Sequence, residues 1–138
     1  MEYTTNQKGL ITEMSVALFL IKLGYNVCQP LNIDSKYDYI VDTGKQLVRI
    51  QVKTSHLNKT NSGIEFKCRS ITVNSNQVNC HYYTNDEIDY FATYWDNEVY
   101  LVPVAQCSST KTLHFNKPAR QDMAWIEDYK ASEVLKTL

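Results

Sequence analysis

Residues 37–54 read YDYIVDTGKQLVRIQVKT, which is two apolar-rich runs joined by the turn-forming tetrapeptide at 42–45. Apolar and polar side chains alternate along the second run, and turn chemistry of this kind between two such runs is typical of a β-hairpin. The segment therefore predicts two antiparallel strands, over about residues 37–41 and 46–54.

The expected hairpin gathers polar side chains on one face, because side chains alternate between faces along a strand. A four-residue turn places Asp38 directly opposite Gln51 and diagonal to Lys53. A two-residue turn pairs Asp38 with Arg49 instead, and Asp38, Arg49, Gln51 and Lys53 still share that face. An odd-length turn without a bulge moves Asp38 to the other face. The alternative without a functional role is that this face is solvent-exposed and carries an ordinary Asp/Lys pair.

The first helix is predicted over about Asn6 to Leu23, with Gly24 as its terminator. Its apolar residues at helical spacing are Leu10, Met14, Ala17, Leu18 and Ile21. Glu13 falls at or beside that apolar face, where a carboxylate loses hydration unless a cation or a donor meets it. Glu13 is either a boundary residue paired with a lysine or an acid that reaches across to Asp38.

The remaining pattern predicts one α/β domain over residues 1–138. Strands are expected at 25–29, 64–73, 88–95, 99–104 and 112–115, a loop at 74–86, and a closing helix at 121–135. In the loop, Tyr82 and Tyr83 either stack on bases or cap a sheet edge.

Composition places the chain among ordinary globular proteins, with 43% hydrophobic and 21% charged residues. The start lacks the pattern of a secretory signal and no apolar run is long enough to span a bilayer, so a cytoplasmic protein without membrane contact is expected. Four scattered cysteines without a C-x-x-C pair favour neither a disulfide framework nor a zinc site.

Charge is unevenly distributed although the net charge is only −1. Residues 45–69 carry six basic side chains against one acid, whereas residues 86–98 carry five acids. A nearly neutral total can therefore hide a basic face of the kind that contacts phosphates, although an uneven solvated surface is the simpler interpretation.

Taken together, these segments resemble the PD-(D/E)xK endonucleases associated with group I introns. The resemblance rests on Lys8-Gly9, Glu13, Tyr37-Asp38, Gln51-Val52-Lys53, Ile88-Asp89-Tyr90-Phe91, the run at 99–104 and the segment at 125–129. It covers nearly the whole chain in the same order of elements.

The resemblance implies a restriction-endonuclease-like αβββαβ core, a central mixed sheet flanked by an N-terminal and a C-terminal helix. It also implies Mg²⁺-dependent cleavage of DNA, with Mn²⁺ able to substitute. By motif, Asp38 is the central metal-ligating carboxylate and Glu13 the helix-borne acid. Gln51 takes the position of the usual acidic residue and Lys53 that of the motif lysine, and the Val52 carbonyl is a further candidate metal ligand.

Two residues depart from the motif name. Tyr37 stands where the name has proline, and Gln51 replaces a carboxylate, which removes one negative charge from a site for a hard cation. The intron-associated subgroup shares this glutamine, and Asp34 is a nearby acid that offers an alternative ligand.

The expected partner is double-stranded DNA, bound by a homo-oligomer, either a dimer or a tetramer, because one small domain covers little duplex. The candidate phosphate contacts are Lys8, Arg49, Lys59, Lys67 and Arg69. The competing functions are a Holliday-junction resolvase, a DNA-binding module without catalysis, and a plain interaction domain.

Overall fold

The computed structural model describes residues 1–138 and contains two α-helices, eleven strands and two short 3₁₀ helices. The elements are α1 (Thr5–Lys22), β1 (Asn26–Cys28), β2 (Tyr39–Asp42), β3 (Leu47–Val52), β4 (His56–Leu57), β5 (Gly63–Lys67), β6 (Arg69–Asn74), β7 (Gln77–Tyr82), β8 (Tyr90–Trp95), β9 (Glu98–Pro103), η1 (Val104–Gln106), β10 (Thr110–His114), β11 (Ala124–Trp125), η2 (Ile126–Tyr129) and α2 (Ala131–Lys136). No helix is both long and apolar enough to cross a membrane.

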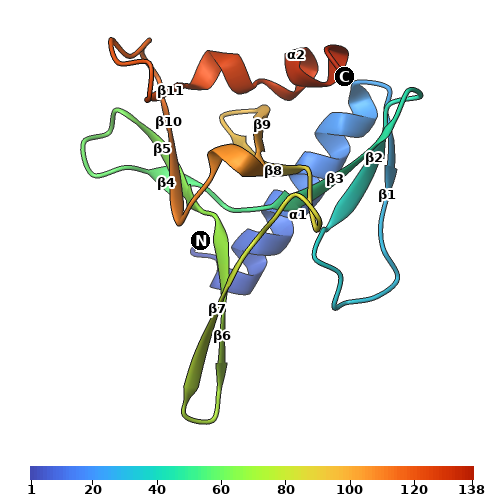
Figure 1. The fold of residues 1–138 in the computed structure, drawn as a ribbon, viewed down its shortest axis with the longest axis vertical. Coiled ribbons are helices and arrows are strands. Elements are labelled where there is room, and N and C mark those ends of the chain that lie inside the picture. Colours follow the sequence, from blue (N-terminus) through green and yellow to red (C-terminus); the bar gives the residue numbers. More distant parts are fainter.

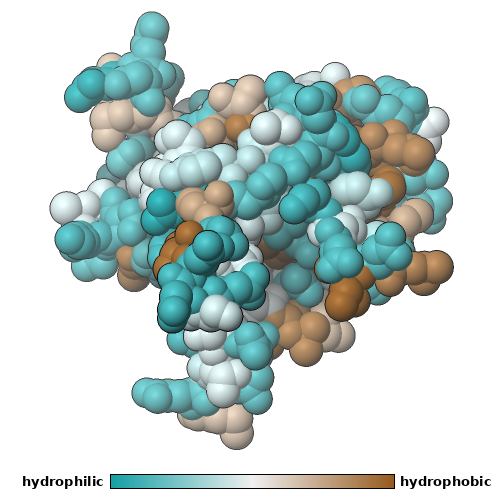
Figure 2. Space-filling view, turned by 60° about the horizontal axis from the view of Figure 1, so that its bottom comes forward, coloured by the Kyte–Doolittle hydropathy of each residue, from teal (hydrophilic) through white to brown (hydrophobic).

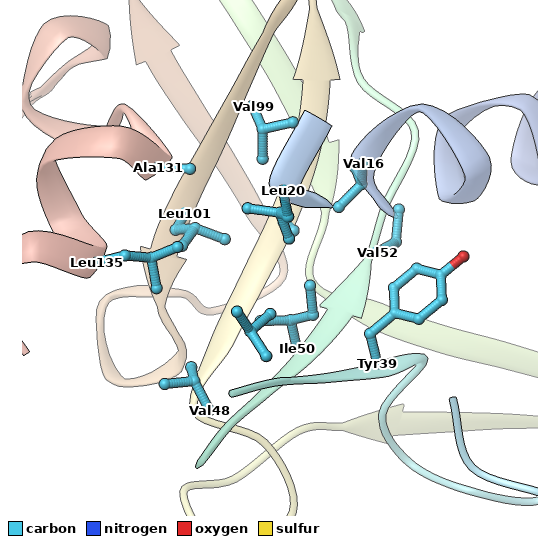
Figure 3. Close-up of a cluster of buried hydrophobic side chains, with 12 residues drawn as sticks. Val16, Leu20, Tyr39, Val48, Ile50, Val52, Val99, Leu101, Ala131 and Leu135 are labelled. Atoms are coloured by element: carbon cyan, nitrogen blue, oxygen red, sulfur yellow. The ribbon is translucent and has the colours of Figure 1, made fainter. Parts of the chain in front are cut away.

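A five-stranded mixed sheet forms the centre, in the order β1-β2-β3-β8-β9. Its neighbours are antiparallel except for β3 and β8, which run parallel. Both helices pack on one face of this sheet, where Leu20 of α1 and Leu135 of α2 join Ile50 of β3 and Leu101 of β9 in a single core (Figure 3). The prediction of an α/β fold with a central mixed sheet and two flanking helices is confirmed, and both helices lie on the same side.

A second, four-stranded sheet in the order β11-β10-β5-β4 covers the opposite face. Phe66 of β5 and Leu113 of β10 are buried there against Phe91 and Val102 of the central sheet. Strands β8 and β9 are therefore sandwiched between two apolar layers, whereas β3 contributes only to the core under the helices. The antiparallel pair β6–β7 belongs to neither sheet and projects from the body as an arm (Figure 1).

The β2–β3 hairpin has a four-residue turn, with Asp42 paired to Leu47 and Tyr39 to Ile50 at the end of the ladder. Asp38 directly precedes β2, and its N–H donates to the Ile50 carbonyl. Gly44 has a φ of 84° in the turn, and its N–H donates to the Asp42 carboxylate at 2.8 Å. A local hydrogen bond and one residue free to adopt positive φ thus set the register of the hairpin.

Helix α1 matches its predicted bounds but not its predicted buried face. Thr4 and Gln7 form a capping box at its start, and Gly24 follows its last turn with a φ of 97°. The buried residues are Thr12, Val16 and Leu20. Four of the five residues predicted to face the core are exposed instead: Leu10, Met14, Leu18 and Ile21. The helix is apolar on two sides, so its periodicity alone does not identify the side that packs.

Three segments differ from their predicted structure. The strand expected over 64–73 breaks at Cys68 into β5 and β6, which belong to different sheets. The loop expected over 74–86 contains β7, and the closing helix expected over 121–135 is β11, a 3₁₀ turn and the short α2. The connection from β3 to β8 carries strands β4 to β7, whereas an αβββαβ core has a helix there.

Candidate active site

Asp38 is held across the β2–β3 hairpin by two backbone contacts. Its own N–H donates to the Ile50 carbonyl at 2.8 Å, and its carboxylate accepts from the Val52 N–H at 2.7 Å. Burial raises the pKa of Asp38, and the hydrogen bond from Val52 and the charge of Lys53 offset part of that rise. The carboxylate is therefore fixed in orientation and poorly hydrated.

Glu13 reaches Asp38 from helix α1. The Tyr39 hydroxyl donates to the Glu13 carbonyl at 3.1 Å, and the hydroxyls of Thr12 and Thr54 lie 3.1 Å apart, so this turn of the helix is docked on β2 and the end of β3. The pKa of Glu13 is raised first by burial, then by the charge of Asp38 and a hydrogen bond between the two carboxyl groups. The fold thus brings together two acids that are 25 residues apart in the sequence.

Lys53 points into the site. Its Nζ donates to the Arg69 carbonyl at 3.2 Å and lies 5.4 Å from the centre of the Tyr83 ring. Burial lowers the pKa of Lys53, while the charge of Asp38 opposes that change. An amine with a lowered pKa gives up its proton more readily, so a larger fraction of Lys53 than of a surface lysine is neutral and able to accept a proton.

Gln51 and Val52 complete the group on β3. Gln51 is half-buried and pairs with Phe91 of β8, on the face that carries Asp38, while the Val52 side chain packs in the core under α1. The N–H of Val52 donates to the Asp38 carboxylate, so the end of β3 lies beside that acid.

The chemistry of these donors suits a hard divalent cation. Burial raises the pKa values of both adjacent carboxyl groups, and the charge of Asp38 raises that of Glu13 further, so the two form a pair that a cation would stabilise. No group of three or more His, Cys, Asp or Glu side chains in residues 1–138 converges on one point. Further ligands would therefore come from neutral oxygens, such as the Gln51 amide or the Val52 carbonyl.

Two of the residues singled out in the sequence lie away from this group. Asp34 is exposed in the β1–β2 connection and lines a different cavity, together with Arg49 and Glu87. The Arg49 guanidinium is bonded within the chain, to both oxygens of Asp89 at 3.0 and 3.2 Å and to the carbonyls of Asn85 and Asp86. Arg49 thus ties the loop before β8 to β3, and four of its five guanidinium N–H groups are already bonded within the chain.

Three other basic residues gather beside Lys53. A cavity of about 660 Å³ is lined by Lys8, Lys53, Lys67 and His56, among others. Arg69 begins β6 next to this cavity, whereas Lys59 is exposed further away, in the turn between β4 and β5. Lys8 and Lys67 therefore line the cavity beside Lys53, and the Arg69 carbonyl contacts Lys53 while its guanidinium reaches the Tyr82 hydroxyl. Arg49 and Lys59 lie outside this group.

Two tyrosines support the site in ways that the sequence did not indicate. Tyr39 docks the helix carrying Glu13, although its position inside an apolar strand suggested only packing. Tyr83 is half-buried, with its ring 5.4 Å from Phe91 and edge-on to it, and it also contacts Lys53. Tyr83 thus packs on Phe91 of the interior strand β8 and not at a sheet edge, while Tyr82 is exposed on the arm.

Comparison with known proteins identifies the family and the fold. A family model described as PD-(D/E)XK endonuclease matches residues 3–132. The chain therefore belongs to the PD-(D/E)XK endonuclease family and is a nuclease that acts on DNA.

The bacterial homing endonuclease I-Ssp6803I has a similar solved structure, with a TM-score of 0.78 and 22% sequence identity over 98% of this chain and 95% of that one. That likeness confirms the predicted restriction-endonuclease-like fold. No curated protein matches this chain.

Proposed function

We propose that this chain is a Mg²⁺-dependent, site-specific DNA endonuclease of the homing type, with Mn²⁺ able to replace Mg²⁺. The observation that carries the proposal is the convergence of Glu13 and Asp38 beside Lys53, a lysine whose pKa burial lowers. This combination supplies ligands for a cation and a base next to it.

In the proposed mechanism, Asp38 and Glu13 hold the metal, together with the Gln51 amide oxygen and the Val52 carbonyl. When bound, a divalent cation would polarise the scissile phosphate and lower the pKa of its own water. Lys53 orients the attacking water, accepts its proton at Nζ and stabilises the charge that develops on the phosphate. The Arg69 carbonyl and the Tyr83 ring keep that amine in place.

Binding to duplex DNA is proposed to come from the basic residues around the cavity. Lys8, Lys67 and Arg69 would contact phosphates, with Lys59 reaching the backbone further from the cut. Removing one basic side chain that binds a phosphate should reduce the dependence of log K on log salt by about 0.9. Replacing Lys67 with alanine should therefore weaken binding and flatten its salt dependence together.

The homing-type assignment is supported by two observations. The chain shares its fold over nearly its full length with a bacterial homing endonuclease, and it has Gln51 where most members of the superfamily have an acid. Selecting cleaved molecules from a randomised duplex library tests the assignment, since a homing-type enzyme enriches one long sequence. Equal cleavage of all library members would contradict it.

The central experiment incubates supercoiled plasmid with the purified protein, with Mg²⁺, with Mn²⁺ or with a chelator. We expect nicked and linear products only with a divalent metal, and none from Asp38→Ala. A protein that binds the plasmid but never cuts it would be a non-catalytic module. Preferential cleavage of a four-way junction over a linear duplex would identify a resolvase instead.

We also propose that the enzyme is a homo-oligomer that pairs through the outer side of α1. Ile11, Met14, Leu18 and Ile21 are exposed at a spacing of three, four and three residues, which is the seam of two packed helices. With Leu10 they expose on the order of 500 Å² of apolar surface, within the range of about 300–600 Å² that marks interaction sites. Pairing with a second copy would cover this seam.

Light scattering coupled to size-exclusion chromatography tests the oligomeric state by measuring the mass of the eluting protein. The parent should have at least twice the mass of one chain, and Leu18→Glu should elute as a monomer because it puts a charge in the seam. Leu31→Glu is the matched control, since Leu31 is fully exposed in the β1–β2 connection. A monomeric parent, or a Leu18→Glu protein of unchanged mass, would contradict the proposal.

A further inference from the structure

The arm formed by β6 and β7 has no packing role that would explain it. The two strands make six residue pairs, from Arg69–Tyr82 at the base to Asn74–Gln77 beside the tip. Every residue from 71 to 80 is exposed. A two-stranded hairpin without a covered face is at best marginally stable in water. The arm therefore adds little to the stability of the protein, and binding to a ligand would give it a role.

The two faces of the arm differ in chemistry. Paired residues lie on the same face, and faces alternate along each strand. One face consists of the pairs Ser70–His81, Thr72–Asn79 and Asn74–Gln77; beyond the base, the other consists of Ile71–Cys80 and Val73–Val78. One face therefore presents only hydrogen-bonding groups and the other only weakly polar or apolar ones.

The polar face carries no formal charge over residues 70–80. Side chains of this kind add nothing to the general attraction between protein and phosphate backbone. Amide and hydroxyl groups both donate and accept, as base edges do, and Asn or Gln can form two hydrogen bonds with adenine. The composition of this face thus suits reading of bases rather than neutral packing against another protein, whose interface centre is apolar.

The base of the arm is attached to the candidate active site. The Arg69 carbonyl accepts from Lys53, and His81 contacts Glu87 at 2.8 Å in the loop before β8. Lys8 and Lys67 line the cavity beside Lys53 and supply the positive charge that the arm lacks. A duplex whose phosphate lies at Asp38 and Lys53 would therefore pass the base of the arm.

The dimensions of the arm match a groove of DNA. Strands of six residues are about 20 Å long at roughly 3.3 Å per residue. The major groove is about 12 Å wide and admits a two-stranded ribbon. The arm projects clear of the body (Figure 1), and its surface is mostly hydrophilic or neutral (Figure 2), so nothing in the chain prevents its insertion.

From these observations we propose that β6–β7 is a recognition arm that enters the major groove and reads base edges with Thr72, Asn74, Gln77 and Asn79. The inference rests on the proposed function, because it concerns the DNA that the active site cuts. It separates two tasks: the residues around Lys53 hold and cut the backbone, and the arm selects the sequence several base pairs from the cut.

The test compares base preferences in a randomised duplex library cleaved with Mg²⁺ and sequenced. Asn74→Ala, Gln77→Ala, Asn79→Ala and the triple variant are compared with the parent. At positions several base pairs from the cut, each single variant should lose roughly tenfold to a hundredfold discrimination against the wrong base. Preferences next to the cut should be unchanged. Circular dichroism and thermal melting establish that each variant is folded.

Val73→Thr and Val78→Thr are matched controls on the other face of the same strands, and both should keep the parent's preferences. If the triple variant prefers the same bases as a cutting parent, the arm does not read DNA and only this inference is wrong. The same holds if the controls change the preferences and the polar-face variants do not. A parent that cuts no library member contradicts the proposed function and this inference with it.

Discussion

The β2–β3 hairpin and the β6–β7 hairpin are antiparallel pairs with regular registers and short turns, but they occupy opposite environments. Val48, Ile50 and Val52 of the first are buried in the core, whereas Ile71 and Val73 at the corresponding alternate positions of the second are exposed. The first has one face buried under the helices and so holds candidate catalytic groups in place. The second leaves its side chains free to meet a ligand.

This difference shows how one local structure can serve two purposes. A buried hairpin cannot move without disturbing the core, so Asp38 and Lys53 are held in fixed positions, as catalysis requires. An exposed hairpin contributes little to stability, so its side chains can change without unfolding the protein. Substitutions in the first hairpin should therefore affect stability and cleavage, whereas substitutions in the second should leave the protein folded.

The largest effect is expected at Asp38. Asp38→Ala should reduce plasmid cleavage to background while the protein stays folded and keeps much of its DNA affinity, because the central metal ligand is removed. Cleavage is followed by gel electrophoresis and binding by anisotropy. Asp34→Ala is the control, an acid nearby in sequence but outside the site. An Asp38→Ala protein that cuts as fast as the parent would refute the site.

Alanine substitutions in the two hairpins should differ in their effect on the free energy of unfolding. Ile50→Ala removes a fully buried side chain and should lower the free energy of unfolding by about 2–5 kcal/mol. Val73→Ala in the arm, where Val73 is 68% exposed, should change it by no more than about 0.5 kcal/mol. Urea denaturation measures both. Equal decreases would mean that the arm is packed in solution.

Removal of the Lys53 amine should mainly affect the chemical step. Lys53→Ala should lower kcat by roughly a hundredfold or more, equivalent to about 3 kcal/mol, because both the base and the stabilising charge disappear. The KM for DNA should change much less. Lys45→Ala serves as control, since Lys45 is exposed in the turn of the same hairpin. A Lys53→Ala protein that loses affinity but keeps kcat would assign this lysine to binding.

The smallest effect concerns the stability of the metal-free protein and its pH dependence. Folding raises the pKa of both Glu13 and Asp38, chiefly through burial, so the folded state binds protons more tightly than the unfolded state. The stabilisation by protonation is complete below the unfolded pKa values and is lost as pH rises through the folded ones. Metal-free parent protein should therefore gain stability as the pH falls from neutral toward those unfolded values.

Asp38→Asn should remove the share of that dependence that comes from Asp38, leave the share that burial gives Glu13, and raise the neutral-pH Tm by roughly a few degrees. The amide oxygen can still accept from the Val52 N–H, so the hydrogen bond that holds the side chain is kept. Mg²⁺ should raise the Tm of the parent but not of this variant. Thermal melts at several pH values, with and without Mg²⁺, measure these effects. A variant less stable than the parent without metal would mean that the two carboxyl groups do not repel each other.

Local sequence was sufficient to predict the β2–β3 hairpin, its register, and the shared face of Asp38 and Gln51. Those features depend on alternation and on a four-residue turn, which act between residues close in the chain. The sequence also indicated the ends of α1 through Gly24 and the type of fold through the order of its motifs.

Three features became visible only once the chain was folded: which side of α1 is buried, how Glu13 meets Asp38, and that the guanidinium of Arg49 is bonded within the chain. Each depends on packing between distant segments, and an apolar pattern on two sides of a helix fits either choice. The arm was predicted only in part: β6 falls largely within the strand expected over 64–73, whereas β7 lies in the segment expected to be a loop. In that mostly polar segment only Val78 and Cys80 alternate with polar residues, and two such residues are too short a pattern to indicate a strand.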